Sequence, residues 1–156
     1  MTKLTRSKER VSALGEVFTP DHIVSDMHDL LDEEKWADKT MIYLEPTCGN
    51  GQFLVQAIQK KLDAGLSPEE AANTVFGIDI MADNVEESRS RVLSVLGETP
   101  LEQRVFDIVR NNIFQANTLE YLAKGPNGED SEWDKKMFLY EDPTGNGMVL
   151  EGSDAV

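Results

Sequence analysis

The chain has 156 residues, of which 40% are hydrophobic, so its length allows one buried core and gives no reason to expect a second domain. Its 29 acidic and 15 basic residues give a formal net charge of -14, and the averaged field of such a molecule repels nucleic acid. No apolar run reaches the roughly 20 residues that cross a bilayer. The single cysteine, Cys48, excludes an internal disulfide, and no cysteine or histidine cluster has metal-ligand spacing. We therefore predict a cytoplasmic protein that binds neither membrane nor metal.

Positive charge gathers at the N-terminus, in the residues Lys3, Arg6, Lys8 and Arg10. We expect residues 1–14 to form a flexible basic arm. Such an arm either contacts phosphate or serves as a frayed, solubilising terminus, and we favour the second interpretation.

The first predicted helix covers residues 21–31, where apolar residues have helical spacing, with Thr19 as N-cap and Pro20 at the first helical position. A short strand at 41–44, a glycine-containing loop at 46–51 and a helix at 52–64 follow. A capping-box pattern then starts a short helix at Ser67, before a buried strand at 75–80.

The alternation continues with predicted helices at 81–96 and 100–110, a strand at 112–116 and a helical turn at 118–122. Right-handed crossovers bury short apolar strands between layers of helix. The predicted fold is therefore α/β, with a mainly parallel sheet flanked by helices, and residues 15–123 form its main domain. Beyond them we expect a loop and a closing strand or hairpin over 124–150, and a tail over 151–156.

The strongest signal for a binding site is the segment LEPTCGNGQFL, residues 44–54, between a predicted strand and a helix. Its glycines let the backbone bend tightly and approach a ligand, while the helix that follows offers free N–H groups. Asp79 ends the next predicted strand, where a carboxylate can accept hydrogen bonds from both hydroxyls of a ribose. Together these features predict a ribose-bearing cofactor.

Four segments resemble motifs of the N6-adenine DNA methyltransferases of restriction-modification systems. EPTCGNGQFL (45–54) looks like the loop with which the family binds its cofactor. GEVFTP (15–20) is similar to the family's element that covers the methionine end of that cofactor, S-adenosylmethionine. FGIDI (76–80) matches the family's strand that binds the cofactor's ribose. NIFQANTL (112–119) resembles the element whose acidic side chain accepts a hydrogen bond from the amine of the cofactor's adenine. The resemblance implies a Rossmann-like methyltransferase fold, truncated after about the fourth strand, with S-adenosylmethionine as cofactor.

The same resemblance implies that Glu45 faces the ammonium group of the cofactor and that Asp79 holds its ribose. The complete implied set of cofactor-binding residues is Phe18, Thr19, Pro20, Glu45, Cys48, Gly49, Gly51, Asp79, Ile80 and Asn117. Asn117 departs from the pattern, because an amide keeps a carbonyl acceptor but lacks the charge of the family's acid. It serves either as a weakened adenine acceptor or as a helix N-cap. 

Three other side chains attract attention without a predicted role in chemistry. We expect Cys48 to be a packing residue and no nucleophile, because it is small and we expect it to be half-buried. His22 and His28 lie off the apolar stripe of the first helix, so we expect both at the surface.

The motif for the target base is the part of the family pattern that is missing. The family carries N/D/S-P-P-Y/F/W after its fourth strand, where the side chain holds the amine and the ring stacks on the flipped base. The only candidates are Asp142 and Pro143, which precede Thr144 and Gly145 in place of proline and the ring. A hairpin turn is the interpretation we favour there, so the catalytic residues stay unassigned.

Three functions fit these observations. The first is a DNA adenine-N6 methyltransferase, or a shortened or split subunit whose protein partner supplies the base pocket and the DNA contacts. The second is a non-catalytic methyltransferase-like module that binds or regulates a restriction-modification complex. The third, a small-molecule methyltransferase, fits the acidic surface but not the motif set. We favour the first.

Overall fold

The computed structural model describes residues 5, 7–97 and 102–123, and all statements below concern these residues. The predicted hairpin over 124–150, the tail over 151–156 and the candidates Asp142 and Pro143 lie outside them.

Three parallel strands in the order β1-β2-β3 form the sheet: β1 (Tyr43–Glu45), β2 (Val75–Asp79) and β3 (Ile113–Gln115). Leu44 pairs with Phe76, and Ile78 pairs with Phe114. Every residue of the central strand β2 is buried, as expected of a parallel strand covered on both faces. The predicted α/β architecture, a small parallel sheet flanked by helices, is confirmed.

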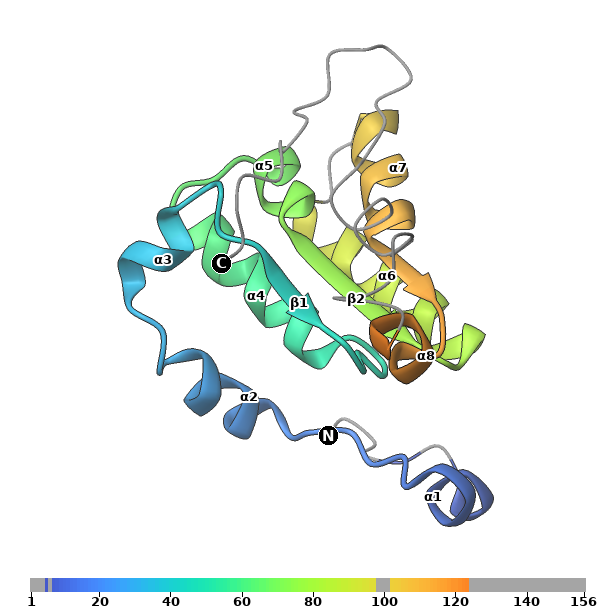
Figure 1. Ribbon diagram of the computed structural model, residues 1–156. Helices are drawn as coiled ribbons and strands as arrows, with labels where there is room; N and C mark the ends of the chain where they lie inside the picture. Colours follow the sequence, from blue (N-terminus) through green and yellow to red (C-terminus); the bar gives the residue numbers. More distant parts are fainter. Residues whose placement is uncertain (1–4, 6, 98–101, 124–156) are drawn as a thin grey trace.

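Helices α4 (Gln52–Asp63) and α6 (Ala82–Leu96) follow β1 and β2 and pack against each other behind the sheet (Figure 1). Helices α5 (Pro68–Asn73) and α7 (Gln103–Asn112) extend the same layer and share its hydrophobic core. The predicted capping box at Ser67 is present, since its hydroxyl accepts from the N–H of Glu70 at 3.2 Å and the Glu70 carboxylate accepts from the N–H of Ser67 at 2.9 Å.

The second face of the sheet carries a smaller apolar cluster. Phe76 and Ile78 pack there with Phe114 and with Tyr121 of α8 (Thr118–Ala123). Figure 1 shows α8 near the carboxyl ends of the strands, where the loops after β1 and β2 also lie. This end of the sheet is therefore built from segments far apart in the sequence.

The N-terminal segment lies outside the sheet as α1 (Lys8–Leu14), α2 (Asp21–His28) and α3 (Glu33–Ala37). The flexible arm expected over residues 1–14 thus contains a helix, whose start is capped by the Ser7 hydroxyl, which accepts from the N–H of Arg10. Helix α2 begins at residue 21, as expected, but its N-cap is Pro20 in place of Thr19, and it ends at His28, three residues before the predicted end. Helix α3 was not predicted, because its five residues contain a single buried apolar side chain, Trp36.

The prediction that His28 lies at the surface is wrong. Its side chain is 3% exposed and contacts the rings of Trp36, Tyr43 and Phe53 edge-on. The hydrogen bond between its Nε2 and the Tyr43 hydroxyl, at 2.8 Å, satisfies one ring nitrogen and makes the burial tolerable. His22 is exposed, as predicted.

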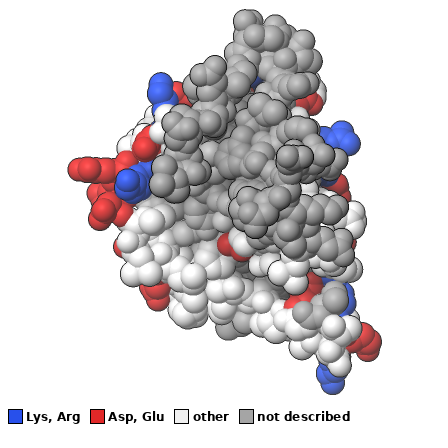
Figure 2. Space-filling model, in the orientation of Figure 1, with Lys and Arg blue, Asp and Glu red and all other residues white. Residues whose placement is uncertain are grey.

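Three features of the described part concern membrane spans, metal ligands and surface charge. No helix within it is long and apolar enough to span a membrane, and no group of three or more His, Cys, Asp and Glu side chains there could hold a metal ion. On the face shown in Figure 2, acidic side chains gather over α3, whose first turn contains Glu33 and Glu34. That region is unsuited to contact with a phosphate backbone.

Candidate functional site

A cavity of about 500 Å³ lies at the carboxyl ends of the strands, a size within the range of small-molecule sites. Four segments line it: 15–19 before α2, 45–53 after β1, 79–84 after β2 and 116–119 after β3. In open parallel sheets the loops that follow the strands meet at this edge and form the ligand site. The segments singled out by the sequence motifs therefore come together around one cavity.

The loop after β1 is fixed to its neighbours by backbone hydrogen bonds. The N–H of Cys48 donates to Ile78 O at 2.8 Å, which ties the loop to β2. The N–H of Gly49 donates to Asp79 Oδ2 at 2.9 Å, and the Ser88 hydroxyl donates to Gly49 O at 2.9 Å. The loop is therefore held in place by contacts with β2 and α6.

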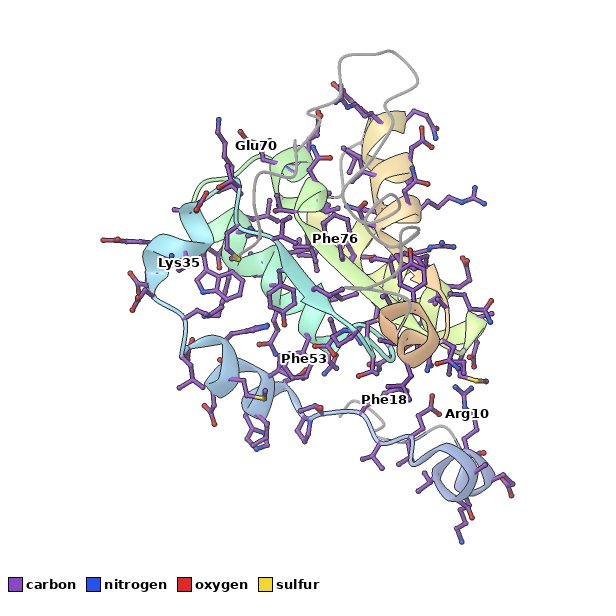
Figure 3. The ribbon with its side chains drawn as sticks, in the orientation of Figure 1. Arg10, Phe18, Lys35, Phe53, Glu70 and Phe76 are labelled. Carbon is purple, nitrogen blue, oxygen red and sulfur yellow. The ribbon has the colours of Figure 1, made fainter. Side chains whose placement is uncertain are left out.

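The two loop glycines face different partners. Gly49 has φ +53°, and a Cβ added to it would lie 3.2 Å from Cδ1 of Phe18. Gly51 has φ +86°, and its added Cβ would lie 2.9 Å from the Ser88 hydroxyl and 3.0 Å from the Ser88 Cα. Gly49 thus lets the Phe18 ring lie on the cavity side of the loop, where Figure 3 shows it pointing toward the strand ends. Gly51 lets the loop pack closely on α6.

Most of the predicted cofactor-binding residues line the cavity: Phe18, Thr19, Glu45, Cys48, Gly49, Asp79, Ile80 and Asn117. Two do not. Pro20 begins α2, and Gly51 faces α6. Their assignment to a ligand stays a prediction, and the geometry gives these two residues a structural task.

Asp79 is 9% exposed and already accepts three hydrogen bonds from the protein. Besides the bond from Gly49, its Oδ1 accepts from the N–H of Met81 at 2.8 Å and from Nδ2 of Asn84 at 3.2 Å. A carboxylate offers about four acceptor positions, so about one remains for a ligand. Asp79 therefore organises the loops around the cavity as well as facing into it.

Glu45 is a half-buried carboxylate at the end of β1. Burial raises its pKa, an effect partly opposed by hydrogen bonds from the Thr47 N–H and hydroxyl. Since burial disfavours the charged form, a cationic group placed beside Glu45 would restore it.

Asn117 precedes α8 and caps it. Its Oδ1 accepts from the N–H of Leu119 at 3.1 Å, and its backbone carbonyl accepts from the N–H of Tyr121 at 2.9 Å. The helix-cap interpretation is therefore seen directly, while the adenine-acceptor role stays a prediction for a residue that also lines the cavity.

Cys48 is 5% exposed, and burial raises the pKa of its thiol to about 12. A thiol in that state is a poor nucleophile at neutral pH, which agrees with a packing role.

Several lining residues escaped the sequence interpretation, and two of them, Glu16 and Asn84, contact each other. Glu16 belongs to the motif at 15–20 but had no assigned task, and Asn84 lies in no motif. Asn84 is 1% exposed and donates through Nδ2 to both Glu16 and Asp79. The separation of 68 residues between Glu16 and Asn84 leaves no local signal by which their contact could be found.

An α/β domain with a parallel sheet and a cavity beyond the carboxyl ends of its strands is a member of the large class of ligand-binding α/β domains. Within that class, the chain belongs to the N-6 DNA Methylase family, whose family model matches residues 3–93.

Two curated relatives are similar to this chain. The Type I restriction enzyme MjaIX methylase subunit of Methanocaldococcus jannaschii is 25% identical over 129 residues, which are 83% of this chain and 22% of the relative. The Type II methyltransferase M.VspI of a Vibrio species is 31% identical over 94 residues, 59% of this chain and 20% of the relative. The chain thus spans about a fifth of the length of these relatives. No solved structure matches it.

Proposed function

We propose that this chain binds S-adenosylmethionine on a Rossmann-like fold and is the cofactor-binding part of a DNA adenine-N6 methyltransferase, which contacts DNA with the help of a protein partner. The observation that carries the proposal is the convergence of the family's cofactor motifs on one cavity at the strand ends. 

The charges around the cavity support this cofactor over one that carries phosphate. Glu16, Glu45 and Asp79 line the cavity, while no Lys, Arg or His does so among the described residues. A pyrophosphate needs cationic or N–H partners, whereas the ammonium and sulfonium groups of S-adenosylmethionine are cationic. The lining therefore fits a positively charged ligand.

Each part of the proposed ligand has a candidate partner. Glu45 would face the ammonium group, and Asp79 would accept from a ribose hydroxyl with its remaining lone pair. The exposed apolar side chains of Ile80 and Leu119, 52% and 81% accessible, border the cavity and would cover the adenine ring. The bound cofactor would supply a methyl group, and these residues would hold and orient it.

Calorimetric titration of the full chain with S-adenosylmethionine tests this site. We expect binding by the unmodified protein, and a loss of at least about tenfold in affinity in Asp79→Ala and Gly49→Val. Gly65→Val is the matched control, because Gly65 also has a positive φ, +96°, but nothing lies within 4 Å of its added Cβ. Equal affinity in Gly49→Val and Gly65→Val would contradict the proposed placement, and absence of binding to the unmodified protein would refute the cofactor assignment.

Methyl transfer is a separate step and needs its own assay. We expect transfer from labelled S-adenosylmethionine to unmodified DNA only when a protein partner supplies DNA contacts, because the net charge of -14 opposes binding to a phosphate backbone. The assay is run with and without the products of neighbouring genes. Cofactor binding with no transfer in any combination would refute the subunit hypothesis.

The same net charge favours a second candidate function. A non-catalytic module that binds a restriction-modification complex would need the cofactor pocket but no DNA contacts. Recovery of a methyltransferase or restriction subunit with the tagged chain from host extract, combined with no transfer, would support it. Recovery of neither subunit would count against it.

A further inference from the structure

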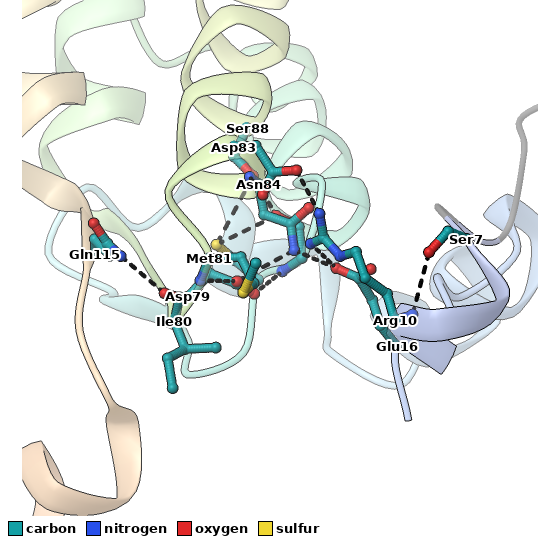
Figure 4. Close-up of polar contacts among 12 residues, drawn as sticks. Ser7, Arg10, Glu16, Asp79, Ile80, Met81, Asp83, Asn84, Ser88 and Gln115 are labelled. Atoms are coloured by element: carbon teal, nitrogen blue, oxygen red, sulfur yellow. Dashed lines mark hydrogen bonds and ion pairs between the residues drawn. The ribbon is translucent and has the colours of Figure 1, made fainter. Parts of the chain in front are cut away.

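A line of polar contacts connects α1 to the proposed cofactor site (Figure 4). The Arg10 guanidinium donates to Glu16 Oε1 and to Asp83 Oδ2, both at 2.5 Å. Glu16 Oε1 also accepts from Asn84 Nδ2 at 2.7 Å, and the same amide donates to Asp79 Oδ1. Residues far apart in the sequence thereby join helix α1 to the carboxyl end of β2.

Except for the contact of Arg10 with Asp83, whose side chain is 52% exposed, these contacts lie at partly buried positions that are shielded from solvent. The side chains of Arg10 and Glu16 are 20% and 11% exposed, and Asn84 is 1% exposed. Two carboxylates, Glu16 and Asp79, share the single amide of Asn84, and such like charges repel each other. Arg10 offsets this repulsion, because its positive guanidinium binds Glu16 Oε1, the same oxygen that accepts from Asn84, and Arg10 itself does not line the cavity.

Glu16 also lies two residues before Phe18, whose ring rests on Gly49. Both residues belong to the segment that follows α1. This segment begins at Gly15, which caps α1 with φ +66°, and nothing lies within 4 Å of a Cβ added to Gly15. The Arg10–Glu16 ion pair thus joins this segment to α1 and holds it in position beside the cavity.

We propose that Glu16, held by Arg10, is a positioning residue for cofactor binding, which orients Asp79 through Asn84 and holds Phe18 over the Gly49 loop. The proposal rests on the proposed cofactor function and adds two residues to its site. The resemblance assigned neither Arg10 nor Glu16 a role.

Calorimetric titration of the full chain with S-adenosylmethionine tests it in Glu16→Gln and Arg10→Met. Glu16→Gln keeps an acceptor for Asn84 but removes the charge that Arg10 binds. We expect each variant to lose roughly tenfold in affinity, and the double variant to lose little more than either, because both changes break the same Arg10–Glu16 ion pair. Arg10→Met also breaks the ion pair with Asp83, whose side chain is 52% exposed, and exposed pairs contribute little. Asp29→Asn is the matched control, since it removes a carboxylate from the Lys60 ion pair at 2.7 Å, away from the cavity, and we expect no change.

A coupling measurement separates positioning from a general structural effect. In an Asp79→Asn background, Glu16→Gln should cost clearly less than its roughly tenfold effect in the unmodified protein, because the part of its effect that passes through Asn84 needs the Asp79 carboxylate. If the fold-losses in affinity of Asp79→Asn and Glu16→Gln multiply in the double variant, the two residues act independently and the proposal is overturned. Arg10→Lys is a second variant for the case that Arg10→Met fails to fold. It keeps the charge but cannot bridge two carboxylates as the forked guanidinium does, so it should also weaken binding.

The outcomes distinguish this proposal from the cofactor assignment itself. If the unmodified chain binds and Glu16→Gln binds as tightly as Asp29→Asn, the positioning role is refuted and the cofactor site stands. If the unmodified chain does not bind, the cofactor function fails, and the positioning role fails with it.

Discussion

Replacing Gly51 by alanine should destabilise the fold more than the same change at other glycines of similar backbone conformation. At φ +86° an L side chain costs about 1–2 kcal/mol. The added Cβ would also lie 3.0 Å from the Cα of Ser88, a backbone atom that cannot rotate away, and overpacking of this kind costs about 1–3 kcal/mol. The total expected loss in the free energy of unfolding is about 2–5 kcal/mol.

Gly65→Ala separates these two contributions. Gly65 has φ +96° but nothing within 4 Å of its added Cβ, so only the conformational cost of about 1–2 kcal/mol applies. Urea unfolding followed by circular dichroism gives both free energies under the same conditions. Gly51→Ala should be less stable than Gly65→Ala by at least about 1 kcal/mol.

Equal destabilisation of the two variants would refute this reasoning. It would mean that α6 moves away from the loop at little cost, and that the contact between Gly51 and Ser88 does not fix the loop. The position of Gly49, which is held by the hydroxyl of the same Ser88, would then be less restricted than the structure indicates.

Three further predictions concern single side chains. Burial, with a smaller effect of Lys60, lowers the pKa of His28 from 6.5 to about 4, so its contribution to stability is complete above pH 6.5 and is lost as the pH falls toward 4. Compared with His28→Phe by urea unfolding, the unmodified protein should lose up to about 3 kcal/mol more between pH 7 and pH 4; parallel pH profiles would contradict this. The buried thiol of Cys48 should react with a thiol reagent at pH 8 at least about a hundredfold more slowly in the native protein than in urea, and fast native labelling would show that the thiol is accessible. Ser67→Ala should reduce the free energy of unfolding by about 1 kcal/mol, because it removes the hydroxyl that caps α5, and an unchanged urea midpoint would refute that role.

Elements with strong local patterns could be predicted from the sequence. Helix α6 was expected at 81–96 and begins at Ala82, and β3 lies within the range 112–116. Their periodicity depends only on neighbours in the chain, which a sequence displays directly. Helix α3 gave no such signal, since one buried Trp36 among charged residues defines no stripe.

The error at His28 has a specific physical cause. The apolar positions of the first helix suggested that Met27 and Leu30 face the core, but their side chains are 51% and 83% exposed, while Val24 and His28 are buried. Hydrophobicity alone oriented the helix incorrectly, because a histidine whose ring nitrogen meets the Tyr43 hydroxyl can occupy a core position. Partners of this kind are contributed by other elements and are invisible in a local pattern.

The candidate site could be located from the sequence because the motifs occur at the ends of successive parallel strands, which the fold brings to one edge. The contacts that support it could not, since Arg10 and Asp83 are 73 residues apart and their pairing depends on how α1 approaches α6. The use of Asp79 as a structural acceptor for Gly49, Met81 and Asn84 was equally hidden.

Capture of the cofactor and transfer of the methyl group make different demands on the chain. Among the described residues, those that line the cavity lie between Gly15 and Leu119, and Asp79 and Gly49 are held by contacts within the protein. Preorganised contacts of this kind reduce the entropic cost of binding, so the proposed pocket does not depend on a base pocket for its shape. Base recognition, in contrast, needs a stacking surface and cationic contacts to phosphate, and the described residues of the cavity lining include no cation. The titration and the transfer assay therefore examine separable properties, and a negative transfer result with this chain alone would leave the cofactor site standing.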